Sequence, residues 1–129
     1  MKIFGIGTDI VNIKRIEKSI KKNGKRFKNK IFSLKEIAYC DNKKNPSSYY
    51  AKRFAAKEAF SKALGTGISK DVSLRNIEVT NNIKGKPLIK LNKKLDIYLK
   101  KRLKSSKYDI HLSLSDDNPW AHATVIISY

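Results

Sequence analysis

Cysteine, tryptophan and methionine each occur only once in this sequence of 129 residues. The single cysteine, Cys40, excludes an intramolecular disulfide, and nothing near it has the spacing of metal ligands. No apolar run reaches the roughly 20 residues that a membrane-spanning helix needs. The opening residues, MKIFGIGTDI, have neither a cleavable signal pattern nor a transit-peptide pattern. These absences predict a cytoplasmic protein with no membrane partner.

Acidic residues are scarce: 11 aspartate and glutamate residues stand against 29 lysine and arginine residues, for a formal net charge of +18. This excess favours an anionic partner, which can be nucleic acid, an acidic protein or a phosphorylated small molecule. Most of the basic residues are lysine, whereas arginine is better suited to bidentate contacts with phosphates or bases. The charge therefore narrows the class of partner without identifying it.

Hydrophobic residues make up 40% of the chain, which is enough for a modest core in one domain of this length. Residue periodicity predicts strands at 2–10, 74–80, 87–91, 108–115 and 120–128, and helices at 12–22, 33–40, 47–64 and 93–103. The sequence has no internal repeat, low-complexity segment or domain boundary. We therefore predict a single small α+β domain over residues 1–129, with a mostly antiparallel sheet packed with helices.

Local signals predict where the helices begin and end. Asn23-Gly24 is expected to close the first helix, because glycine readily takes the left-handed conformation there. Ser33–Glu36 has the form of a capping box at the start of the second helix. The long helix is expected to be capped by Ser47 or Ser48 and to end at Gly65.

The segment FAAKEAFSKALGTG, residues 54–67, predicts a largely buried helix that nevertheless carries Glu58 and Lys62 on one side. One interpretation is an ordinary surface ion pair, which contributes only about 0.2–0.5 kcal/mol. The other is that both groups face a ligand. Asp9, at the end of the first strand, has the same ambiguity, because it can simply cap the following helix. Two carboxylates and a lysine together would suit Mg²⁺ bound to a phosphate.

Four segments occur in a distinctive order: GIGTDIVNIKRI (5–16), KRFAAKEAFSKALGTGI (52–68), GKP (85–87) and HLSLSDD (111–117). With these segments the chain resembles the holo-[acyl-carrier-protein] synthase family of short bacterial-type 4′-phosphopantetheinyl transferases. The resemblance extends to the last strand and implies that family's fold. It also implies the transfer of the phosphopantetheine arm of coenzyme A to a serine of apo acyl carrier protein in fatty acid biosynthesis. Adenosine 3′,5′-bisphosphate would be the second product.

The resemblance also implies roles for individual residues. Asp9 and Glu58 match the carboxylates that bind Mg²⁺ in the family. The residues expected at coenzyme A are Arg53, Lys62, Gly65, Gly67 and His111, and those expected to act in catalysis are Glu58, Lys62 and His111. The serine proton can pass to Glu58 or to a water on the metal, and the sequence leaves both open. Asn12 stands where the family commonly has an acidic residue.

The segment Lys14–Lys30 is densely basic, which indicates either a solvated lysine-rich face or a docking surface for an acidic partner. Acyl carrier proteins are small and strongly acidic, so the resemblance favours docking. The expected docking residues are Arg15, Lys22, Arg26 and Lys28. The family is typically homotrimeric, with active sites between subunits, and the sequence does not say which subunit would supply which residue.

A basic nucleic-acid-binding protein of ribosomal type is the main alternative. It accounts for the charge but not for Asp9 and Glu58, which would repel a phosphate backbone. Aromatic residues for stacking are also missing, since Phe27 is the only one in Lys14–Lys30. A second alternative, an inactive homologue that binds coenzyme A, is disfavoured by the intact Asp9, Glu58 and Lys62. We therefore predict an enzyme without a nucleic-acid partner.

Overall fold

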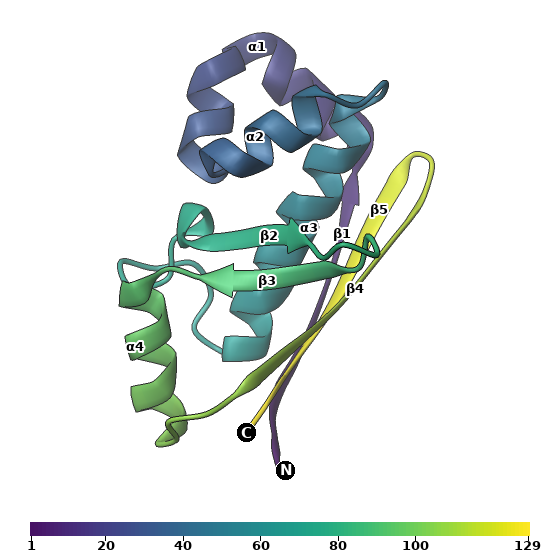
Figure 1. Cartoon of the computed structure of the whole chain (residues 1–129). Coiled ribbons are helices and arrows are strands. Elements are labelled where there is room, and N and C mark those ends of the chain that lie inside the picture. Colours follow the sequence, from purple (N-terminus) through teal and green to yellow (C-terminus); the bar gives the residue numbers. More distant parts are fainter.

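The computed structural model describes all 129 residues, and its elements follow one another in the order shown by the colours of Figure 1. These elements are β1 (Ile3–Asn12), α1 (Ile13–Ile31), α2 (Leu34–Asp41), α3 (Pro46–Leu64), the 3₁₀ helix η1 (Leu74–Asn76), β2 (Ile77–Asn81), β3 (Pro87–Leu91), α4 (Lys93–Leu103), β4 (Asp109–Asp117) and β5 (Trp120–Ser128). The predicted bounds of β3, α4 and β5 are confirmed. None of the helices combines the length and the hydrophobicity needed to cross a bilayer.

The strands form two antiparallel sheets. One has the order β1-β5-β4, and the other is the hairpin of β2 and β3. In the larger sheet Asp9 is level with Ala123 of β5, which is in turn level with Leu114 of β4. Both chain termini lie at one end of this sheet (Figure 1). The predicted α+β class with antiparallel pairing is confirmed.

Helix α3 packs against β1 and β5 and is buried on most sides. Its close approach to β1 depends on glycine. A Cβ atom on Gly7 would lie 1.9 Å from the carbonyl oxygen of Ala59, and one on Gly5 would lie 1.9 Å from that of Ala63. Any other residue at these two positions would push the strand away from the helix. The contact sets α3 against β1, so that the next inward residue of the strand, Asp9, reaches the helix.

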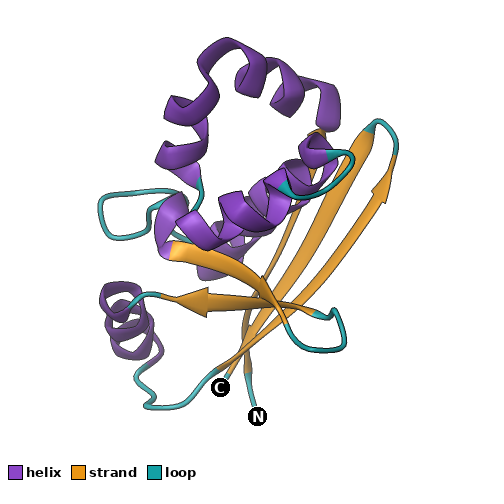
Figure 2. Cartoon of the chain, turned by 45° about the horizontal axis from the view of Figure 1, so that its top comes forward, coloured by secondary structure: helices purple, strands orange, loops and turns teal.

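The helices gather on one side of the three-stranded sheet and leave its other face bare (Figure 2). Alternate residues of a strand point to opposite faces. The inward set is buried, with Val11, Ala123 and Val125 at most 3% exposed. On the outward face, Ile6 and Ile10 of β1 are 63% and 61% exposed. The outward face of the sheet therefore carries exposed apolar side chains that nothing within the chain covers.

The predicted interruption of the helix at Asn23-Gly24 is confirmed, but a second helical segment, which was not predicted, follows it within α1. Gly24 has φ 47° and ψ −123°, which kinks the helix, and the helical turns then continue to Ile31. Phe27 and Ile31 pack on the core after the kink and so hold the second segment in place. The local sequence correctly indicated the residue at which the helix is interrupted. The helical segment after Gly24 depends instead on packing against residues far away in the chain.

The predicted cap of α3 is wrong. The helix begins at Pro46, with Asn45 at the cap position and no side-chain capping bond. Proline suits the first helical position because it has no N–H that needs a partner there. By contrast, the capping box is confirmed, because Ser33 Oγ accepts from the Glu36 N–H at 3.2 Å and Glu36 Oε1 accepts from the Ser33 N–H at 2.9 Å. The segment Leu74–Asn76, predicted as strand, is the 3₁₀ helix η1.

Candidate active site

Asp9 and Lys62 meet where β1 crosses α3. Lys62 Nζ lies 3.1 Å from Asp9 Oδ1, and it donates a second hydrogen bond to the Thr8 carbonyl oxygen at 2.9 Å. The Asp9 side chain is 16% exposed and that of Lys62 is 54% exposed. Lys62 therefore pairs with a residue more than 50 positions away and not with Glu58 one turn earlier. The interpretation of Glu58 and Lys62 as an ordinary helical ion pair is wrong.

Glu58 lies within electrostatic range of this pair. Burial raises the pKa of the Glu58 carboxyl, and the negative charge of Asp9 raises it further. The positive charges of Lys62 and Arg15 lower that pKa in part. The carboxylates of Asp9 on β1 and Glu58 on α3 are thus near enough to repel each other, and the neighbouring cations offset this repulsion only in part. A divalent cation would relieve this repulsion.

The pair of carboxylates fits one class of metal. No group of three or more histidine, cysteine, aspartate or glutamate side chains is placed to hold a metal ion. A closed structural zinc site would need four such protein ligands. Mg²⁺ takes only one or two carboxylates and completes its coordination with water and ligand oxygens. Asp9 and Glu58 therefore fit a hard divalent cation shared with an oxygen-rich ligand.

The raised pKa of Glu58 leads to a testable effect on stability. Because the folded-state pKa lies above the unfolded one, ionised Glu58 destabilises the fold once the pH rises through the carboxyl range. We expect Glu58→Gln to raise the melting temperature by about 1–3 °C near pH 7, and by less near pH 4, where the wild-type group is protonated. The gain is small because solvent screens a half-buried charge. Thermal melts in a chelating buffer would measure it, and a lower melting temperature near pH 7 would contradict the assignment.

Gly65 and Gly67 follow α3 with φ of 83° and 66°. The N–H of Gly65 donates to the carbonyl oxygens of Ser61 and Lys62, both at 3.1 Å, and the N–H of Gly67 donates to that of Ser61 at 3.4 Å. The two amides expected at a phosphate are thus bonded to the end of the helix in this structure. Termination of α3 is sufficient to explain both glycines.

Arg53 lies apart from Asp9 and Glu58, at a cavity of about 250 Å³. Its guanidinium carbon is 4.2 Å from the ring centre of Tyr39, and its Nη2 donates to Asn81 Oδ1 at 2.8 Å. Arg53 is 3% exposed, and its Nε has no hydrogen-bond partner. A buried N–H without a partner is rare and costs free energy, so a ligand that offers an acceptor would stabilise it. The other residues that line the cavity are Tyr49, Lys52, Gly85, Pro87 and Leu114.

His111 lies on the face of the sheet opposite to Asp9. It is level with Ile126 of β5 and Ile6 of β1, which both belong to the outward set, whereas Asp9 belongs to the inward set. His111 Nε2 is 3.1 Å from Ser128 Oγ. The sheet itself separates the imidazole from the two carboxylates, so one chain does not bring His111 to them.

The predicted docking residues lie along both halves of the kinked α1. Arg15, Lys22 and Arg26 are exposed, and Arg15 is near enough to Glu58 to influence its pKa. Lys28 is less available, because its Nζ lies 2.9 Å from Asp41 Oδ1 and its side chain is 20% exposed. The kink therefore separates one basic group beside the carboxylates from another beside α2.

Comparison with known proteins identifies the family. Residues 5–125 match the model of the 4′-phosphopantetheinyl transferase superfamily. The holo-[acyl-carrier-protein] synthase of Bartonella bacilliformis is 49% identical over 127 residues, which covers 97% of this chain and 95% of that one. The chain belongs to this transferase family.

Solved structures of the family have the same fold. The holo-[acyl-carrier-protein] synthase of Neisseria meningitidis matches this transferase with a TM-score of 0.91 and 41% identity, over 99% of this chain and 100% of that one. That of Helicobacter pylori, solved in complex with coenzyme A, has a TM-score of 0.83 and 39% identity, over 95% of this chain and 99% of that one. The resemblance inferred from the four motifs is confirmed, and the ribosomal-type alternative is set aside.

Sequence reasoning missed several residues that shape the transferase. Tyr39 and Asn81 hold Arg53, and no signal in the sequence pointed to either of them. Lys57 and Glu36 form a buried ion pair, with 2.7 Å between Lys57 Nζ and Glu36 Oε1. A signal for Lys57 was present, because it lies among small and aromatic residues in FAAKEAF, where a solvated lysine is out of place.

Proposed function

We propose that this transferase moves the 4′-phosphopantetheine arm of coenzyme A to a serine hydroxyl of apo acyl carrier protein, with release of adenosine 3′,5′-bisphosphate. We further propose that the reaction depends on Mg²⁺ and belongs to fatty acid biosynthesis in the cytoplasm. One observation carries the proposal: Asp9 on β1 converges with Glu58 and Lys62 on α3, in a chain whose relatives are named holo-[acyl-carrier-protein] synthase. A lone Cys40, whose thiol pKa is raised to about 12 by burial, accords with a reducing compartment.

In this reaction the serine oxygen attacks the phosphorus that carries the pantetheine arm, and the bond from that phosphorus to the bridging oxygen breaks. Positioning and charge neutralisation supply most of the catalysis in such a step. Asp9 and Glu58 would hold Mg²⁺, which when bound neutralises charge on the diphosphate. The ammonium group of Lys62, whose side chain is half-exposed, would leave Asp9 and bind a phosphate oxygen instead.

Glu58 is the proton acceptor that we propose for the serine hydroxyl. Bound Mg²⁺ would offset the rise in the pKa of its carboxyl that burial and Asp9 cause, so the position of Glu58 beside Asp9, and not an unusual basicity, supports this role. The Arg53 cavity would take a further part of coenzyme A, because its unpartnered Nε needs an acceptor. Gly65, Gly67 and His111 remain proposed contacts to the same molecule.

We also propose that the active enzyme is a homotrimer with sites between subunits. Two features support self-association. Ile6, Ile10 and Trp120 expose apolar surface on the bare face of the sheet, which a second copy would cover. His111 lies on that same face, so only another copy can bring a histidine to Asp9 and Glu58.

The direct test combines purified protein, Mg²⁺, coenzyme A and an apo acyl carrier protein. We expect the mass of the carrier protein to increase by one phosphopantetheine group, and we expect no increase when a chelator replaces Mg²⁺. A carrier protein without its acceptor serine is the matched negative control. An unchanged carrier mass, where a known transferase succeeds in parallel, would remove the proposed function.

Neutralising Arg15 is expected to weaken docking of the acidic carrier protein. Arg15→Ala should raise the KM for the carrier protein by about 5–20-fold, change kcat little and flatten the dependence of KM on salt, because rim charges act mainly on association. Lys28→Ala is the matched control, since its partner Asp41 already neutralises that charge. Steady-state kinetics at two salt concentrations would test this, and equal KM values for both variants would place the docking surface elsewhere.

A further inference from the structure

A buried ion pair between α3 and α2 has no part in the reaction described above. Lys57 of α3 is 0% exposed and Glu36 of α2 is 1% exposed. Burial of two charges is costly, and hydrophobic residues of similar volume often stabilise a core equally well. The pair therefore needs an explanation other than filling space.

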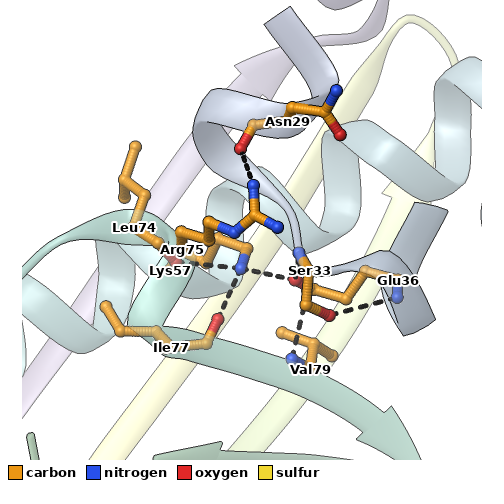
Figure 3. Close-up of polar contacts among 8 residues, drawn as sticks. All are labelled: Asn29, Ser33, Glu36, Lys57, Leu74, Arg75, Ile77 and Val79. Carbon is orange, nitrogen blue, oxygen red and sulfur yellow. Dashed lines mark hydrogen bonds and ion pairs between the residues drawn. The ribbon is translucent and has the colours of Figure 1, made fainter. Parts of the chain in front are cut away.

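Lys57 uses all of its hydrogen-bonding capacity (Figure 3). Its ammonium group is paired with Glu36 and also donates to the carbonyl oxygens of Leu74 and Ile77, at 2.9 and 2.5 Å. Three acceptors match the three protons of the group. The ammonium is therefore held in one position.

Glu36 is held equally firmly. Its Oε1 accepts from the Ser33 N–H at 2.9 Å, and its Oε2 accepts from the Val79 N–H at 3.1 Å. The pair thus joins α2, α3, η1 and β2 at one point. Beside it, Arg75 of η1 donates to the carbonyl oxygen of Asn29 in α1 (Figure 3). Helices α1, α2 and α3 are thus connected around this pair, with η1 and β2 between them.

The Lys57 side chain closes a loop of the chain. Leu74 is 17 residues beyond Lys57 and Ile77 is 20 residues beyond it. The ammonium group therefore links the middle of α3 to the far end of the connection that follows the helix. Inside this loop lie the proposed site residues Glu58, Lys62, Gly65 and Gly67.

Lys57 also restrains the rotation of α3 about its own axis. Successive residues of an α-helix are about 100° apart, which places Glu58 and Lys62 roughly 100° and 140° round from Lys57. Ala59 and Ala63, which touch β1, lie roughly 200° and 240° round from it. The face that carries Glu58 and Lys62 thus lies between two fixed contacts, the buried pair on one side and β1 on the other.

We propose that Lys57, held by Glu36, is a positioning residue for the transfer reaction. It anchors both ends of the segment that carries Glu58 and Lys62, and it sets the angle at which they face Asp9. The inference rests on the proposed function and adds to it a charged residue, Lys57, that does not contact the substrate. Misplacement by about 1 Å at such a site can cost about 100-fold in rate.

The test uses two variants and a matched control. Lys57→Met nearly keeps the length of the side chain and removes its three donors. Glu36→Gln keeps the shape of its side chain, removes the charge and replaces one of the two acceptor oxygens by an NH2 group. Leu99→Ala is the control, because Leu99 is 0% exposed in α4 and its truncation destabilises the core without removing any hydrogen bond of this loop. Thermal melts establish that each variant is folded and how far its stability falls. Calorimetry with coenzyme A in excess Mg²⁺ gives Kd, and the carrier-protein assay gives kcat and KM.

For Lys57→Met we expect Kd for coenzyme A to rise about 10-fold and kcat to fall about 10–100-fold, while the carrier-protein KM stays within about twofold. Glu36→Gln should also raise Kd and lower kcat, but by smaller factors. Leu99→Ala should change neither Kd nor kcat. Wild-type Kd and kcat in the folded variants would overturn the proposal, as would an equal loss in Leu99→Ala. If Lys57→Met does not fold, Glu36→Gln decides alone. Failure of the wild-type protein to bind coenzyme A would instead overturn the proposed function, and this inference with it.

Discussion

Asp9→Ala and Glu58→Ala are each expected to lower kcat by about 100–1,000-fold or more, because each removes one of the two carboxylates proposed to hold Mg²⁺ against the diphosphate. The fold should survive. Asp9 makes one ion pair, to a half-exposed lysine, and the loss of such a pair costs less than about 1 kcal/mol. The carrier-protein mass assay measures the rate, and circular dichroism measures the melting temperature.

Asp96→Ala is the matched control for these two variants. Asp96 also pairs with a lysine, with 2.9 Å between its Oδ2 and Lys100 Nζ, but it lies on α4 and has no proposed role in transfer. Its replacement should leave kcat unchanged. If Asp9→Ala or Glu58→Ala, correctly folded, transferred phosphopantetheine at the wild-type rate, the metal assignment would be wrong.

Mixed assemblies of two inactive variants are expected to regain activity. Glu58→Ala and His111→Ala should each lose about 100-fold or more in kcat, the second because the imidazole no longer reaches the diphosphate. In a ring of three, a site that takes Glu58 from one copy and His111 from its neighbour is intact once in every mixed trimer. Trimers that contain both variants, purified through two different affinity tags, should therefore recover about a third of the wild-type activity.

The control for this experiment is a mixture of Asp9→Ala with Glu58→Ala. Asp9 lies near enough to Glu58 within one chain to raise its pKa, so we expect both carboxylates of a site to come from the same copy, and no combination of these two variants rebuilds a complete site. We expect no recovery there. Full activity of His111→Ala alone would contradict the role of His111, and inactive Glu58/His111 mixed trimers would contradict the sharing of sites between copies.

Local patterns predicted most of the fold. The alternation in β4 and the periodicity of α4 depend on neighbours two to four residues away, so they can be read from a short window. The capping box of α2 and the left-handed Gly65 are equally local. The second helical segment of α1, after Gly24, could not be predicted in this way, because Phe27 and Ile31 pack on distant residues that no window around Gly24 contains.

The sequence alone determined which chemical groups are available. It contains the carboxylates, lysines and glycines of the candidate site, in the order that is typical of the transferase family. Only the tertiary structure decided how they are combined. It paired Lys62 with Asp9 and not with Glu58, placed His111 on the opposite face of the sheet, and buried Lys57 on Glu36. The physical reason is that residue types and local spacing are properties of short segments. Strand register and the buried face of a helix depend instead on contacts between segments far apart in the chain, such as that of Gly7 with Ala59.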